Sequence, residues 1–126
     1  MGWDIRSTGF HLVLSADVPH IAETILPACV RSFLESQELD VKDIDVWVSH
    51  PGGPKVIDGI EKGLELPLDA LEMSRECLRD VGNLSSASVL IVLQKTLEKK
   101  QIKKGSYGLL LAMGPAFCAE LVLLKW

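Results

Sequence analysis

The hydrophobic positions of this chain change between extended and helical spacing along its length. Apolar residues dominate four short runs, 9–14, 44–49, 107–113 and 118–124, which predict strands. Residues 19–36 instead place Ile21, Ile25, Cys29 and Phe33 at intervals of four, as an amphipathic helix does. Pro27 falls inside this segment and is expected to kink the helix, because an interior proline costs roughly 3 kcal/mol.

Three more helices are predicted further along the chain. One begins at Pro54 and carries Ile57, Ile60 and Leu64 on one face, and a second runs from 67 to 81 and stops at Gly82. The third, 85–100, is apolar on nearly every side. A helix without a polar face is expected in a protein interior, so this helix should not add to the exposed apolar surface.

The order of these elements predicts the fold class. Strands and helices alternate, and the last two strands form an antiparallel hairpin around residues 114–117. We therefore expect one α/β domain over residues 1–126, with a mixed sheet, helices on both faces and a C-terminal hairpin. In such sheets, ligands gather beyond the carboxyl ends of the strands.

Composition narrows the classes of function. The chain has 126 residues, a net charge of −4 and a pI of about 5.3, which argues against nucleic-acid binding. No apolar run of 18 residues is present, so no membrane span is expected. The three cysteines lack paired or metal-ligand spacing, which favours a reducing cytoplasm and no metal site. We expect Cys29, Cys77 and Cys118 to be small core residues.

Two short segments carry the candidate chemistry. Residues 49–54 place His50 after a strand and before Pro-Gly-Gly-Pro, and residues 82–87 place Asn83 just before a helix. An imidazole and a carboxamide can both point N–H donors at one oxyanion. Each also has a simpler interpretation, since the histidine could hydrogen-bond its turn, and Asn83, Ser85 or Ser86 could cap the helix.

These two segments, followed by Gly114-Pro115, resemble the C-terminal half of type III polyketide synthases, the chalcone and stilbene synthase family of the thiolase-like fold. The resemblance covers nearly the whole chain and is greater to bacterial members. Ketoacyl synthases of the same fold also carry a histidine and a Gly-Asn-x-Ser segment, but their histidine is followed by Gln-Ala-Asn. The residues after His50 therefore favour the polyketide branch.

The resemblance implies a role for each matching residue. Family members load an acyl group from a coenzyme A thioester onto a cysteine and extend it with malonyl-CoA. His50 and Asn83 match the catalytic pair that binds the enolate oxygen, and Ser85, Gly114 and Pro115 match residues of the substrate cavity. Leu12 falls where plant members keep a gatekeeping phenylalanine. The loop 112–116 reads Ala-Met-Gly-Pro-Ala rather than Gly-Phe-Gly-Pro-Gly, which changes the outline of the cavity there.

The family's nucleophilic cysteine lies in the N-terminal half, which has no counterpart in this chain. The resemblance therefore implies that residues 1–126 act with that half, in a homodimeric enzyme, and are inactive alone. Two alternatives stay open at this point. The chain could belong to another condensing enzyme such as a ketoacyl synthase, or it could be a non-catalytic binding module.

Overall fold

The computed structural model describes residues 2–13, 15–114 and 118–126, without the side chain of Leu12. The strands are β1 (Gly2–Arg6), β2 (Gly9–Val13), β3 (Ile44–Ser49), β4 (Tyr107–Met113) and β5 (Ala119–Lys125). The helices are α1 (Val18–Thr24), α2 (Leu26–Glu35), α3 (Pro54–Leu64), α4 (Glu72–Val81) and α5 (Ser86–Lys99), with a short 3-10 turn, η1 (Val41–Asp43), before β3.

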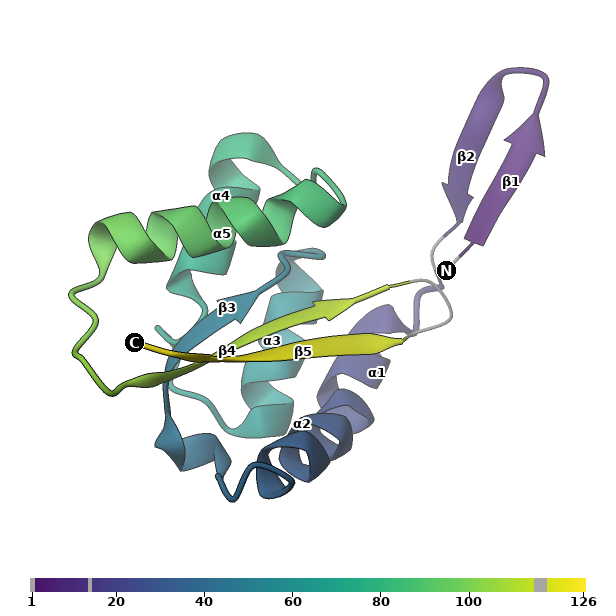
Figure 1. Ribbon diagram of the computed structural model, residues 1–126. Helices are drawn as coiled ribbons and strands as arrows, with labels where there is room; N and C mark the ends of the chain where they lie inside the picture. Colours follow the sequence, from purple (N-terminus) through teal and green to yellow (C-terminus); the bar gives the residue numbers. More distant parts are fainter. Residues whose placement is uncertain (1, 14, 115–117) are drawn as a thin grey trace.

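The body of the molecule is a three-layer α/β arrangement (Figure 1). Its sheet has the order β3-β4-β5, in which β3 and β4 are parallel and β4 and β5 antiparallel. Helices α1, α2 and α3 lie on one face, and α4 and α5 on the other (Figure 1). The predicted mixed sheet with helices on both faces and a C-terminal hairpin is therefore confirmed.

Strand β3 contributes to the apolar core on both faces of the sheet. Its Trp47 packs into the cluster under α1–α3, whereas Val46 and Val48 pack into the cluster under α4 and α5. A strand buried on both faces reads as a continuous apolar run, as 46–48 does. A register shift between Ile44 and Val46 places Ile44 in the same cluster as Trp47.

The predicted helix 19–36 is two helices rather than one kinked helix. Helix α1 ends at Thr24 and α2 begins at Leu26, with Ile25 between them. Pro27 has no N–H to donate to the carbonyl of Glu23, so the helical ladder cannot continue through this point. Proline instead occupies the first turn of α2, where a missing N–H costs nothing.

The predicted helix 67–81 begins five residues later than expected, at Glu72. Residues 67–71 form turns, in which the N–H of Ala70 donates to the carbonyl of Pro67 (3.0 Å). A helix here would place Leu68 and Leu71 on the same face. Leu71 is fully buried in the core while Leu68 is almost fully exposed, so these turns separate two side chains that a helix would align.

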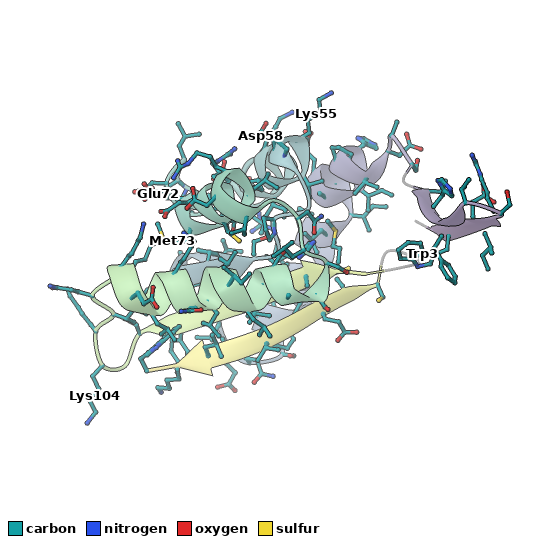
Figure 2. All side chains as sticks on the ribbon, turned by 90° about the horizontal axis from the view of Figure 1, so that it is seen from above. Trp3, Lys55, Asp58, Glu72, Met73 and Lys104 are labelled. Carbon is teal, nitrogen blue, oxygen red and sulfur yellow. The ribbon has the colours of Figure 1, made fainter. Side chains whose placement is uncertain are left out.

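Helix α5 is not an interior helix, contrary to the prediction. Its buried residues are Ser88, Val92 and Thr96, whereas Leu90 and Leu97 are 62% and 51% exposed. Viewed from above, α5 crosses the strands with no other element lying over it (Figure 2). The helix therefore adds Leu90 and Leu97 to the exposed apolar surface, to which it was expected to contribute nothing.

Two of the three cysteines also depart from the expected core positions. Cys77 is buried in α4, but Cys29 on α2 and Cys118 just before β5 are exposed. Strand β1 was not predicted, although its alternating Trp3-Asp4-Ile5-Arg6 pattern is typical of a strand. It pairs with β2 in a hairpin that stands away from the body (Figure 1).

Candidate active site

His50 lies at the carboxyl end of β3, where the chain leaves the sheet. Its backbone N–H donates to the carbonyl of Leu111 on β4 (2.9 Å), and its own carbonyl accepts from Gly52 (2.9 Å). One residue earlier, the carbonyl of Ser49 accepts the buried hydroxyl of Ser74 (2.7 Å). The backbone on both sides of His50 is therefore held by the sheet and by α4.

Asn83 joins this loop to the segment before α5. Gly82 ends α4 with a positive φ of 73°, and the chain then turns back toward the end of β3. The Asn83 Nδ2 donates to the carbonyl of Gly52 (3.3 Å), and its Oδ1 accepts the N–H of Ser85 (2.9 Å). The two segments that the sequence singled out are thus in direct contact, through the amide of Asn83.

Ser85 has a backbone conformation that serine rarely adopts, with φ 58° and ψ −134°. Such a residue stores strain of roughly 1–3 kcal/mol, which proteins tolerate mainly at functional sites. The alternative interpretation, in which the side chain of Ser85 caps α5, is wrong. Ser85 makes no side-chain cap bond, and the hydroxyl of Ser88 instead accepts the N–H of Leu84 (2.7 Å).

Gly114 follows β4 and lies at the same edge of the sheet as His50, because β3 and β4 are parallel. Its N–H donates to the carbonyl of Cys118 (2.9 Å), at the base of the C-terminal hairpin. Pro115 lies outside the described residues. Leu12 is opposite Trp3 in the β1–β2 hairpin, but its side chain is likewise outside the described part.

The surroundings of His50 affect its charge. The residue is half-buried, and burial lowers the pKa of its imidazole below the ordinary value of 6.5. The ring is therefore neutral near pH 7 and carries one N–H donor. A neutral imidazole can donate to an oxyanion, but near pH 7 it becomes a cation only if a nearby negative charge raises its pKa again.

The sequence did not reveal that the carbonyl of Gly52 is the acceptor that orients Asn83, because a backbone acceptor has no sequence signature.

The described residues include no cluster of three or more histidine, cysteine or acidic side chains arranged to hold a metal ion. Within the same residues, no helix has the length and apolar character needed to cross a bilayer.

Comparison with known proteins identifies the family. The family model "Chalcone and stilbene synthases, C-terminal domain" matches residues 2–126. The chain belongs to this family. It is 48% identical over 126 residues to a 1,3,6,8-tetrahydroxynaphthalene synthase of Streptomyces peucetius, and 40% identical to a putative chalcone synthase of Bacillus subtilis.

Solved structures agree with this assignment. The 1,3,6,8-tetrahydroxynaphthalene synthase of Streptomyces coelicolor, a bacterial type III polyketide synthase, superimposes with a TM-score of 0.93 at 33% identity. This match covers 99% of the chain and 36% of that structure. PKS-I from the brown alga Ectocarpus siliculosus gives 0.89 at 30% identity, covering 98% of the chain and 34% of its own length.

The expected thiolase-like fold is thereby confirmed. The chain spans about a third of the length of the curated relatives it matches, 33% of the Streptomyces peucetius enzyme and 34% of the Bacillus subtilis protein.

Proposed function

We propose that this chain supplies the histidine and asparagine of a type III polyketide synthase, which condenses an acyl-CoA starter with malonyl-CoA by decarboxylative Claisen chemistry. The observation that supports this best is the hydrogen bond from Asn83 Nδ2 to Gly52, two residues after His50. It brings the amide to the edge of the sheet where the imidazole lies.

The proposed chemistry needs donors for a developing negative charge. When malonyl-CoA loses carbon dioxide, the electron pair of the broken C–C bond moves into the thioester and leaves an enolate oxygen. An N–H of His50 and the second N–H of the Asn83 amide would donate to this oxygen. Donors fixed before the reaction cost no reorganisation, and each is typically worth a few kcal/mol of barrier.

The lowered pKa of His50 supports the role of neutral donor in the decarboxylation step. Its second role, holding the nucleophilic cysteine as a thiolate, requires the protonated ring. The charge of the thiolate itself would favour that form, because an opposite charge within about 4–6 Å raises the pKa of an imidazole. The imidazolium therefore depends on the cysteine being present.

The proposed partner of this chain is the part of the polypeptide that carries the cysteine, without which we expect no turnover. The exposed apolar side chains of α5 support this, because Leu90 and Leu97 lie two turns apart on one face. Leu84, next to Asn83 and just before α5, is also half-exposed. A segment packed on this face would be able to present a nucleophile to His50 and Asn83.

Two further features of the complete protein are part of the proposal. The family resemblance implies a homodimer. The three cysteines of the chain are free, which supports a reducing compartment such as the cytoplasm. Gly114, Pro115, Ser85 and Leu12 would line the substrate cavity, and coenzyme A thioesters would be its substrates, with no permanently bound cofactor.

The test uses the complete protein and measures decarboxylation of malonyl-CoA. His50→Ala and Asn83→Ala should each reduce the rate by about 10²–10³, the typical effect of losing one oxyanion donor. His20→Ala and Gln94→Ala are matched controls, because they remove an exposed imidazole on α1 and an exposed amide on α5 and should leave the rate unchanged.

Alkylation of the nucleophilic cysteine by iodoacetamide separates the two roles. His50→Ala should slow it near neutral pH, because the thiolate loses its partner, and Asn83→Ala should leave it nearly unchanged. If both folded variants decarboxylate malonyl-CoA at the wild-type rate, the proposal is wrong. The two segments would then serve only as a turn and a cap.

A further inference from the structure

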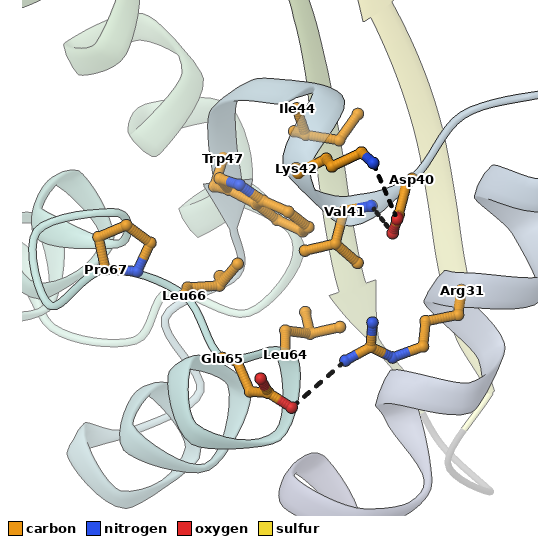
Figure 3. Close-up of a pocket in the computed structure, with 10 residues that line it drawn as sticks. All are labelled: Arg31, Asp40, Val41, Lys42, Ile44, Trp47, Leu64, Glu65, Leu66 and Pro67. Atoms are coloured by element: carbon orange, nitrogen blue, oxygen red, sulfur yellow. Dashed lines mark hydrogen bonds and ion pairs between the residues drawn. The ribbon is translucent and has the colours of Figure 1, made fainter.

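A second concave site lies beside the first half of β3 (Figure 3). It is a half-open cavity of about 450 Å³ lined by residues of α2, η1, the end of α3 and β3. Its wall includes Ile44 and Trp47, six and three residues before His50, which is roughly 20 and 10 Å along an extended strand, and His50 itself is not among the lining residues. The cavity is therefore separate from the candidate active site, and its volume is within the ~300–1,000 Å³ usual for small-molecule sites.

The floor of this cavity is apolar. The half-buried Val41 and Leu66 present accessible apolar surface, and the buried Trp47, Ile44 and Leu64 lie behind them. Figure 3 shows the side chains of Trp47, Val41 and Leu64 directed toward one another across the cavity. Such a surface favours a hydrocarbon or aromatic body, because burying apolar area is stabilising at about 25 cal/mol per Å².

The rim of the cavity carries two positively charged side chains, each of which forms only a long ion pair. The guanidinium of Arg31 is 4.0 Å from the carboxylate of Glu65, and the ammonium of Lys42 is 3.9 Å from that of Asp40 (Figure 3). Both distances exceed a normal hydrogen bond. An exposed pair of this kind contributes little, so an anion that enters the cavity can replace the carboxylate beside Arg31.

The two rim carboxylates differ in their freedom to move. Asp40 is fixed, because its Oδ1 accepts the N–H of Val41 (2.6 Å) and it forms a capping box with Asp43. Glu65 follows α3 in a left-handed conformation, and its side chain extends mostly into solvent. Arg31 can therefore exchange Glu65 for a ligand, whereas Lys42 keeps a fixed counter-charge.

From these contacts we infer that this cavity, defined by Trp47, Leu64 and Arg31, binds a small amphipathic carboxylate. The apolar body of the ligand lies on Val41 and Leu66 beside Trp47, and its carboxylate accepts two parallel N–H bonds from the guanidinium of Arg31. Both an aromatic and an alkyl body fit this apolar floor. The site requires neither His50 nor Asn83.

Isothermal titration of the complete protein with 2-naphthoate and with octanoate tests this inference. At least one should bind saturably, and the tighter of the two identifies the body as aromatic or aliphatic. The neutral 2-naphthamide should bind more weakly than 2-naphthoate. Arg31→Gln should weaken binding of the carboxylate at least about tenfold, because charge-assisted hydrogen bonds are lost.

Glu65→Gln, at an exposed position, should change the affinity for the carboxylate in the opposite direction. Removing the carboxylate that competes for Arg31 should tighten binding severalfold without affecting the fold. Arg79→Gln, at an exposed arginine of α4, is the matched control and should have no effect. His50→Ala should also bind normally, which separates this site from the active site. Absence of saturable binding, binding that survives Arg31→Gln, or binding lost in His50→Ala would each overturn the inference.

Discussion

At the scale of single residues, Asn83 combines the two interpretations that its sequence allowed. Its Oδ1 accepts the N–H of Ser85 and so satisfies a backbone group at the start of α5. Its Nδ2 donates to Gly52 and so fixes the amide beside the loop of His50. The capping interaction orients the amide rather than competing with the proposed catalytic role, because an amide nitrogen carries two donors and only one is used here.

His50 provides a prediction about pH. Because burial lowers its pKa below 6.5 in the folded chain, the unfolded chain binds a proton first as the pH falls. The contribution of His50 to the free energy of unfolding should therefore be constant above about pH 6.5. It should decrease as the pH falls from there toward the pKa of His50 in the folded chain. NMR titration of the His50 ring should give a pKa below 6.5.

The control for this titration is His50→Gln, which keeps a neutral polar side chain. Urea unfolding of this variant between pH 5 and 7 should lack the part of the pH dependence that His50 causes. A folded-state pKa of 6.5 or higher in the isolated chain would contradict the prediction. It would also weaken the proposed role of the ring as a neutral donor.

At the scale of elements, the contact between α1 and α3 depends on small residues. Gly59 packs against the carbonyl of Pro19, and a Cβ at this position would lie 2.7 Å from that oxygen. Gly63, one turn later, packs against the carbonyl of Glu23 and the ring of Pro27. Pro27 has no N–H to donate to the carbonyl of Glu23, so this carbonyl lies at the break between α1 and α2. The break therefore lies against a glycine of α3.

Gly63→Ala should therefore destabilise the chain, although alanine is the better helix former by up to about 1 kcal/mol. The added methyl group would overlap the carbonyl oxygen of Glu23 and lie 2.7 Å from Pro27 Cγ, so α1 and α3 would have to separate. Overpacking of this kind costs about 1–3 kcal/mol. Lys55→Ala, at an exposed position of α3 (Figure 2), is the control and should change the free energy of unfolding by less than about 0.5 kcal/mol.

Urea denaturation of both variants measures these differences. An unchanged or higher unfolding free energy for Gly63→Ala would mean that the α1–α3 contact adjusts without cost. The close approach of the two helices would then have no role in stability.

At the scale of the whole molecule, two groups of exposed apolar side chains each share one face of an element. One is the outer face of α5, with Leu90 and Leu97. The other is one face of the β1–β2 hairpin, where Trp3, Ile5 and Phe10 are 63%, 73% and 73% exposed. Trp3 and Phe10 meet edge to face with ring centres 6.3 Å apart. Exposed apolar surfaces of this kind usually mark an interface.

The isolated chain should therefore self-associate in a concentration-dependent way, which light scattering or sedimentation velocity would detect. The double variant Leu90→Gln/Leu97→Gln should shift the chain toward monomer, because it removes the apolar side chains of the α5 face. Leu68→Gln changes a more exposed leucine, 87% exposed in the turns before α4, and should leave association unchanged. A strictly monomeric wild-type chain at high concentration would contradict this prediction.

The sequence alone determined the class of the fold and the residues of the candidate site. The alternating periodicities placed β3, α3, α5 and β4 within about one residue, because local spacing of apolar side chains reflects which face is buried. The motifs around His50 and Asn83 are also local, so their residue types and their positions at element ends could be read directly. The β1 strand was missed although its alternating pattern was visible, and the short η1 turn was missed as well.

Tertiary structure decided which surfaces are buried and which groups meet. Periodicity shows that α5 is apolar on several sides, but only packing shows that Val92 faces the sheet while Leu90 and Leu97 remain uncovered. The contact between Asn83 and Gly52 joins positions 31 residues apart through a backbone carbonyl, which no side-chain pattern encodes. Such contacts follow from how the chain closes around the sheet, so they could be found only in the folded structure.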